Sequence, residues 1–202
     1  VKLVGSSHGG CSRLVGYAPA GVTDLKHLKG RTIAVSDLNA PGKNFFSVLL
    51  AKAGIDPERE VAWRQFPGDM LGLAVEKGEA QAIADGDPNL LLIQRRTQGL
   101  VDLATNLTGE YAAKTCCVLG VSGALVRNDR ATAAALTRAI VEASDFVADN
   151  PAETARIYSP YSKVPQSELR AVLGTLTHRS HPGGRALREE IEFYARDFKL
   201  VK

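Results

Sequence analysis

The segment Asn39-Ala40-Pro41-Gly42-Lys43 has the composition of an anion-binding turn, because it follows a predicted strand and opens a predicted helix. The first N–H groups of a helix have no partner within the helix and attract anions, and the helix dipole adds about 0.3–1 kcal/mol. Gly42 would let the backbone approach a ligand closely, and Lys43 adds a positive charge. The pattern favours an oxyanion such as nitrate, bicarbonate, a sulfonate or a carboxylate. Taken alone, a plain strand-to-helix turn is the simpler interpretation.

Two carboxylates, Asp85 and Asp87, follow another predicted strand. They lie at the end of the strand where α/β sheets bind ligands. A carboxylate there suits a cationic or hydrogen-bond-donating ligand, such as an amine or an aminopyrimidine. Asp87 could instead cap the helix that follows, and we favour capping for it. A zwitterion or a polar heterocycle would suit both the anion-binding turn and these carboxylates.

Two signatures of nucleotide-dependent enzymes are missing from the sequence. There is no P-loop and no G-x-G-x-x-G turn. Cys11 and His8 could form a nucleophile and base, but no third residue to orient them is evident. His27, His178 and His181 have no partnering pattern, and we expect the last two in a solvated loop. These observations favour a binding protein over an enzyme.

Strands and helices alternate through the first half of the chain, which predicts a mainly parallel sheet covered by helices. Glycines such as Gly54 and Gly78 mark helix ends. The second half contains one long strand-like run at 115–126, and only helices follow it. The predicted strands are 2–5, 14–17, 31–35, 60–66, 80–84 and 100–103, and the predicted helical segments are 24–30, 44–53, 67–77, 88–95, 129–148, 151–158, 166–176 and 185–198.

Composition excludes several other classes of protein. The 202 residues are 45% hydrophobic and 23% charged, with a net charge of +3 that is too small and too scattered for a nucleic-acid binder. No apolar run approaches the roughly 20 residues that span a bilayer. Three cysteines cannot form a disulfide framework. The sequence begins with neither Met nor a signal peptide, so we expect a processed, trimmed or incomplete chain.

Four segments resemble a known family in their order and spacing. Residues 24–35 (DLKHLKGRTIAV), 50–57 (LAKAGIDP), 70–82 (MLGLAVEKGEAQA) and 85–88 (DGDP) are similar to segments of the nitrate/sulfonate/taurine and thiamine-precursor (NMT1-like) substrate-binding proteins of ABC transporters. His8-Gly9-Gly10-Cys11 and Cys116-Cys117 resemble a subgroup that carries HGGC and a cysteine pair. The resemblance covers most of the chain.

The resemblance implies a periplasmic binding protein type II-like α/β fold, with two lobes joined by two hinge strands. Residues 1–20 would end lobe I and form the first crossing, 21–114 would form the complete lobe II, and 115–202 would return and pack on lobe I. The first half of lobe I would precede residue 1, so a preceding segment or a second chain would complete that lobe.

The implied function is capture of a small solute for an importer, without catalysis or a cofactor. The partners would be the solute and a membrane permease, with no nucleic acid, and the location would be periplasmic or extracellular at the membrane. Ala40 stands where sulfonate binders often have Ser or Thr, which weakens a sulfonate assignment. The predicted ligand-binding residues are His8, Gly10, Cys11, Asn39, Ala40, Gly42, Lys43, Asp85, Asp87 and Cys116.

The cysteines allow three interpretations if the two crossing strands lie side by side. His8, Cys11, Cys116 and Cys117 could hold a metal ion, since thiolates and imidazoles bind zinc and other soft metals. Cys11 could form a disulfide with Cys116 or Cys117. The thiols could also be buried or line a ligand cleft, which we favour; we therefore expect no metal.

Two other functions have the same broad fold. One is a metal-dependent pyrimidine-precursor synthase, which uses a longer cysteine run than Cys116-Cys117. The other is the effector-binding domain of a LysR-type regulator, which would normally follow a helix-turn-helix domain.

Overall fold

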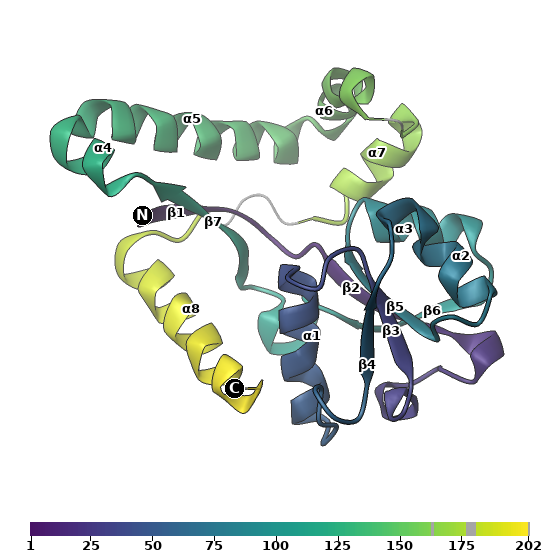
Figure 1. The fold of residues 1–202 in the computed structure, drawn as a ribbon. Helices are drawn as coiled ribbons and strands as arrows, with labels where there is room; N and C mark the ends of the chain where they lie inside the picture. The colour runs from purple at the N-terminus through teal and green to yellow at the C-terminus, as the bar shows by residue number, and fades with distance from the viewer. Residues whose placement is uncertain (163, 177–180, 202) are drawn as a thin grey trace. The chain divides into compact units, whose positions relative to one another are not determined.

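The computed structural model describes residues 1–162, 164–176 and 181–201 (Figure 1). The chain forms two compact units, each described by itself. Unit 1 comprises Val1–Gly10 and Gly109–Phe193, and unit 2 comprises Cys11–Thr108 and Tyr194–Lys202. Among the described residues, none of the helices is long and apolar enough to cross a membrane. The expected lobe boundaries at residues 20 and 114 stay a prediction.

Unit 2 contains a five-stranded mixed sheet in the order β4-β3-β5-β2-β6. Strand β3 is parallel to both β4 and β5, whereas β2 is antiparallel to both β5 and β6. The strands are β2 (Ser12–Tyr17), β3 (Thr32–Val35), β4 (Ala62–Gln65), β5 (Ala82–Gly86) and β6 (Leu100–Thr105).

The expectation of a mainly parallel sheet is therefore only partly right. Helical crossovers connect β3 to β4, β4 to β5 and β5 to β6, so these four strands run in one direction. Only the short 3-10 segments η1 (Ala18–Ala20) and η2 (Leu25–Leu28) connect β2 to β3. Without a helical crossover to reverse the chain, β2 runs the opposite way and separates β5 from β6.

Helices cover both faces of this sheet. Helices α2 (Leu71–Glu76) and α3 (Asn89–Arg96) pack on one face, where Val15, Ala34 and Ile83 join their apolar side chains in one buried cluster. Neighbouring strand residues point to opposite faces, so Leu14, Ile33, Val35 and Ala84, which are also buried, face the other side. Helix α1 (Pro41–Lys52) contacts β5 and β2 there, and η6 (Phe198–Val201) contacts α1.

Most helix ends in unit 2 lie near their predicted positions. Helix α1 ends before Gly54, whose φ of 79° is in the left-handed region that glycine adopts without strain. The helix expected at 67–77 is a 3-10 turn, η3 (Gly68–Met70), followed by α2.

Unit 1 consists of a two-stranded ribbon and several helices. Strand β1 (Lys2–Gly9) pairs antiparallel with β7 (Thr115–Val121). The strand expected at 115–126 is wrong beyond Val121, because Ser122 and Gly123 favour a turn and helix α4 begins there. The helical segments are η4 (Gly109–Tyr111), α4 (Gly123–Asn128), α5 (Arg130–Asp149), α6 (Pro151–Tyr158), η5 (Ser159–Tyr161), α7 (Gln166–Leu173) and α8 (Gly184–Asp197), whose last residues belong to unit 2.

The four helices expected after the ribbon are confirmed, with small differences at their ends. Helix α6 has the predicted bounds. The Asp129 side chain caps α5 by accepting a hydrogen bond from Thr132 N–H at 3.0 Å.

Candidate functional site

One edge of the unit 2 sheet gathers the residues that the sequence singled out in this unit. Strands β3, β4, β5 and β6 end at this edge, and the antiparallel strand β2 begins there. Ser36 follows β3, Asp85 lies near the end of β5 and Ser12 opens β2. The carboxyl edge of an open α/β sheet is where such folds bind ligands.

Helix α1 presents its N-terminus at this edge, as predicted. Ala40 is the N-cap and makes no side-chain cap, and Pro41 is the first helical residue. Gly42 is buried. If it carried a Cβ atom, that atom would lie 3.9 Å from Ser12 Oγ and 4.0 Å from the Phe46 ring. The N-terminus of α1 is therefore packed against the start of β2. Asn39 is exposed, and its N–H donates to Asp37 Oδ1 at 2.8 Å.

Lys43 has contacts within its own unit. Its Nζ lies 3.8 Å from Glu58 Oε1 and 5.7 Å from the centre of the Trp63 ring. Its side chain is 19% exposed, whereas that of Glu58 is 65% exposed. An anion bound by Lys43 would therefore compete with a weak, solvent-screened contact.

Asp85 is held by hydrogen bonds from three parts of unit 2. Its carboxylate accepts from Ser36 Oγ at 3.0 Å, from Gly86 N–H at 2.9 Å and from Asn89 Nδ2 at 2.6 Å. The Asn89 amide also donates to Gly68 O at 3.2 Å. These bonds connect β3 and β5 to the first turn of α3. A direct contact between Asp85 and a ligand stays a prediction.

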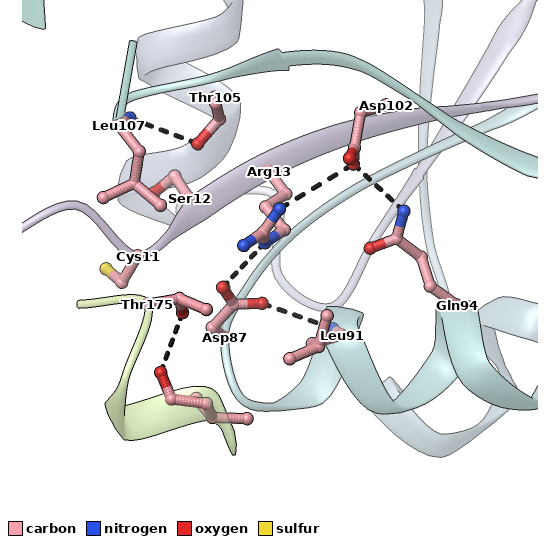
Figure 2. Close-up of polar contacts among 12 residues, drawn as sticks. Cys11, Ser12, Arg13, Asp87, Leu91, Gln94, Asp102, Thr105, Leu107 and Thr175 are labelled. Atoms are coloured by element: carbon pink, nitrogen blue, oxygen red, sulfur yellow. Dashed lines mark hydrogen bonds and ion pairs between the residues drawn. The ribbon is translucent and has the colours of Figure 1, made fainter. Parts of the chain in front are cut away.

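Asp87 forms a buried ion pair with Arg13, which Figure 2 shows. Arg13 Nε lies 2.7 Å from Asp87 Oδ2, and the Asp87 side chain has no exposed surface. The other carboxylate oxygen accepts from Leu91 N–H at 3.2 Å, so the capping interpretation of Asp87 is confirmed. A ligand contact through Asp87 is a prediction that this burial does not support.

The Arg13 guanidinium also lies near a second, more exposed carboxylate. Its Nη1 is 3.8 Å from Asp102 Oδ1, and Gln94 Nε2 donates to the same oxygen at 3.0 Å (Figure 2). The Asp102 side chain is 59% exposed, so the main partner of Arg13 is Asp87.

In unit 1, His8 on β1 lies directly opposite Cys117 on β7. A hydrogen bond with the Cys117 side chain raises the pKa of His8, and the negative charge of the Cys117 thiolate adds to the effect, while partial burial of the ring opposes it. Cys116, which was predicted to contact a ligand, is the half-buried neighbour in β7. Gly10, which follows β1, has a φ of 59°, in the left-handed region that glycine adopts without strain. None of the three cysteines, all of them among the described residues, forms a disulfide.

A profile of the NMT1-like family matches residues 17–159, which is more than half of the chain. The chain belongs to the NMT1-like family. A search of curated protein sequences found no match.

Solved structures share the fold of this NMT1-like chain at low sequence identity. The alkanesulfonate-binding protein SsuA from Xanthomonas axonopodis pv. citri, bound to MOPS, has a TM-score of 0.76 at 16% identity. The periplasmic aliphatic sulphonate-binding protein SsuA from Escherichia coli has 0.78 at 14%. The ligand-binding component of an ABC-type import system from Staphylococcus aureus, with zinc bound, has 0.74 at 14%. These matches cover 99, 98 and 98% of our chain, which spans 70, 62 and 67% of theirs. The expected type II binding-protein fold is thereby confirmed.

Three residues of this NMT1-like chain were missed at the sequence level. Arg13 is one. Asn106 is another: its buried Oδ1 accepts from Cys11 N–H and Ser12 N–H, both at 3.0 Å, and so fixes the start of β2. The sequence signal for Arg13 was its own charge, which stands directly before the apolar pair Leu14-Val15.

The third residue, His181, corrects an expectation. We expected it in a solvated loop, but its side chain is only 14% exposed. Its Nδ1 lies 3.0 Å from Ser6 O, and its Nε2 lies 3.2 Å from Asp145 Oδ1. His181 therefore connects the segment before α8 to β1 and α5. His178, which we expected in the same loop, lies outside the described residues.

Proposed function

We propose that this chain is part of the solute-binding component of an ABC importer and that unit 2 contacts a small oxyanion, or the anionic group of a polar solute, at the carboxyl edge of its sheet. The observation that carries the proposal is the N-terminus of α1, which makes no side-chain cap and meets the start of β2 at Gly42 and Ser12. Free N–H groups at such an end attract anions.

Two further observations support an anionic group over a cationic one. The carboxylate of Asp87 is neutralised by Arg13, and that of Asp85 already accepts three hydrogen bonds. Asp87 is therefore not suited to attract a cation, and most of the acceptor positions of Asp85 are already in use. Among the proposed contacts, Lys43 adds a positive charge in the first turn of α1.

The similar structures support the transport role. The proteins named above are binding proteins or a ligand-binding component of an import system, and none of the three is named as an enzyme. On this basis the partner of the whole protein is a membrane permease, and its location is periplasmic or extracellular.

The test compares solute classes and two lysines of one helix. Thermal unfolding of the protein is measured with nitrate, bicarbonate, alkylsulfonates, amino acids and pyrimidines, and the dissociation constant of any solute that stabilises it is then measured by calorimetry. A solute at about 100 times its dissociation constant adds roughly 2.7 kcal/mol of stability. Lys43→Met should weaken binding of an anion severalfold. Lys52→Met is the matched control, because Lys52 lies at the other end of α1 and pairs with Asp197 at 2.9 Å.

Equal effects of the two substitutions would contradict a binding site at the N-terminus of α1. Stabilisation by no solute would contradict the transport role itself. A response to iron that depends on Cys116 or Cys117 would instead favour the metal-dependent synthase.

A further inference from the structure

Unit 1 holds an imidazole and a thiol on directly opposed strands. His8 and Cys117 are partners in the register of β1 and β7. Directly opposed residues of antiparallel strands have Cβ atoms about 4.5–5.5 Å apart, which is close enough for their side chains to interact. His8 is half-buried, whereas Cys117 is exposed. The pair therefore combines an accessible sulfur with a neighbouring base.

The two groups stabilise each other's charged forms. A hydrogen bond that the His8 ring donates to the Cys117 sulfur, assisted by the charge of the thiolate, raises the pKa of His8 despite the partial burial of the ring. Coupling between two charges is mutual, so an imidazolium at His8 favours the thiolate of Cys117 as much as the thiolate favours the imidazolium. A thiolate beside a protonated histidine is the reactive form of cysteine.

The backbone around the pair is held in place by hydroxyl groups. Ser6 Oγ and Ser7 Oγ donate to Cys117 O at 3.3 and 3.4 Å, and Thr115 Oγ1 donates to the buried Ser6 Oγ at 2.8 Å. The ribbon register shifts on both sides of His8, between Ser6 and His8 and between His8 and Gly9. These bonds fix the position of Cys117 where the regular ladder is interrupted.

Other titratable groups contact this part of the ribbon without being opposite Cys117. Glu190 accepts from Thr115 N–H at 2.9 Å, and His181, with Asp145, contacts Ser6 O. Cys116 lies next to Cys117, but adjacent residues of a strand point to opposite faces. The register does not place Cys116 opposite His8.

We propose that Cys117 is a site of reversible covalent modification, where its thiolate exchanges with small disulfides and His8 keeps it in the reactive form. The Cys117 sulfur attacks one sulfur of a disulfide R–S–S–R. A bond forms between Cys117 Sγ and that sulfur, the original S–S bond breaks, and the leaving thiolate RS⁻ takes a proton from water. The protein gains one R–S group, and one RSH is released. His8 acts as a positioning residue and transfers no atom to the product.

The experiment isolates each thiol and follows its reaction with DTNB, an aromatic disulfide that releases a coloured thiolate. A protein carrying Cys11→Ser and Cys116→Ser keeps Cys117 as its one thiol, and a protein carrying Cys11→Ser and Cys117→Ser keeps Cys116. Each is prepared with His8 and with His8→Asn. Rate constants are measured between pH 6 and 9, with circular dichroism and urea unfolding to verify the fold.

We expect His8→Asn to slow the reaction of Cys117 by about tenfold or more at pH 6 and by much less at pH 9, where an ordinary thiol with a pKa near 8.5 is itself ionised. With His8 present, the rate constant should fall between pH 8 and 6 by far less than the roughly tenfold per unit typical of an isolated thiol. The rate constant of Cys116 should not depend on His8.

Three results would overturn the proposal. They are equal rate constants at pH 6 with and without His8, an equal effect of His8→Asn on Cys116, and a Cys117 that reacts only after denaturation. If the His8→Asn proteins do not fold, the pH profile of the protein with His8 decides by itself: a tenfold decrease per pH unit overturns the proposal, and a shallow profile supports it.

Discussion

The two units have similar lengths but bury their apolar side chains very differently. The core of unit 2 draws on strands β2, β3 and β5 and on helices α1, α2 and α3, with Phe46, Leu14 and Ile83 fully buried. In unit 1, by contrast, helices α5 and α6 expose large apolar side chains. Among the described residues, the buried apolar side chains of unit 1 are Tyr111, Ala133, Ala155, Leu169, Val172 and Leu187, and the exposed large ones include Leu136, Ile140, Phe146, Ile157, Tyr158 and Tyr161.

This contrast follows from the size of the two sheets. A five-stranded sheet covered on both faces removes many apolar groups from water, at roughly 25 cal/mol per Å². A two-stranded ribbon is too small to do the same for the helices beside it. We therefore expect most of the stability of these 202 residues to lie in unit 2, and local opening to need less free energy in unit 1.

The sharpest test of the contrast uses one phenylalanine from each unit. Phe46 in α1 has no exposed surface and packs edge-on against Phe45, with ring centres 5.1 Å apart, whereas Phe146 in α5 is 43% exposed. Phe46→Ala should cost about 3–5 kcal/mol of unfolding free energy, since it leaves a cavity. Phe146→Ala should cost about 1 kcal/mol or less. Urea unfolding followed by circular dichroism measures the loss of unfolding free energy for each variant. Similar losses would contradict the idea that only unit 2 has an extensive core.

The next test compares ion pairs. Arg13→Met in unit 2 leaves the buried Asp87 carboxylate without its partner and should cost about 3 kcal/mol. Adding Asp87→Asn to that variant should recover part of the loss, because the unpaired charge is removed. The control is Arg156→Met in unit 1, where the pair with Glu153 is solvent-exposed and no measurable loss is expected. If Arg156→Met and Arg13→Met lowered the unfolding free energy equally, burial would not determine how much these ion pairs stabilise the protein.

Local sequence signals predicted the elements of both units better than their arrangement. Gly54 and Gly78 adopt φ angles of 79° and 74°, and each ends a helical segment near the predicted position. The direction of β2 was not predictable in this way, because it depends on pairing with β5 and β6, far along the chain. Alternating apolar residues define the faces of a strand but not the direction in which it runs.

The candidate site shows the same limit. The segment at 39–43 was correctly placed at the start of a helix, since the signal lies within five residues, although α1 begins at Pro41 and not at residue 44. Asp87 caps α3 as its position suggested. The partner of Asp87 was not predictable, because Arg13 lies 74 residues earlier. The partners of His181 are equally distant: Ser6 is 175 residues away and Asp145 is 36 residues away. Tertiary contacts of this kind have no spacing that a sequence pattern can reveal.

His181 offers a smaller test inside unit 1. Both ring nitrogens of His181 have a polar partner, the Ser6 carbonyl at 3.0 Å and the Asp145 carboxylate at 3.2 Å. His181→Gln cannot reproduce both contacts and should cost about 1–2 kcal/mol. Because few other buried contacts hold unit 1 together, hydrogen exchange should quicken in β1 and α5 and stay unchanged in the unit 2 sheet. The exposed His27 is the control, and His27→Gln should alter neither unit. Faster exchange throughout unit 2 after His181→Gln would mean that the two units unfold together. The difference between their cores would then not give them different stabilities.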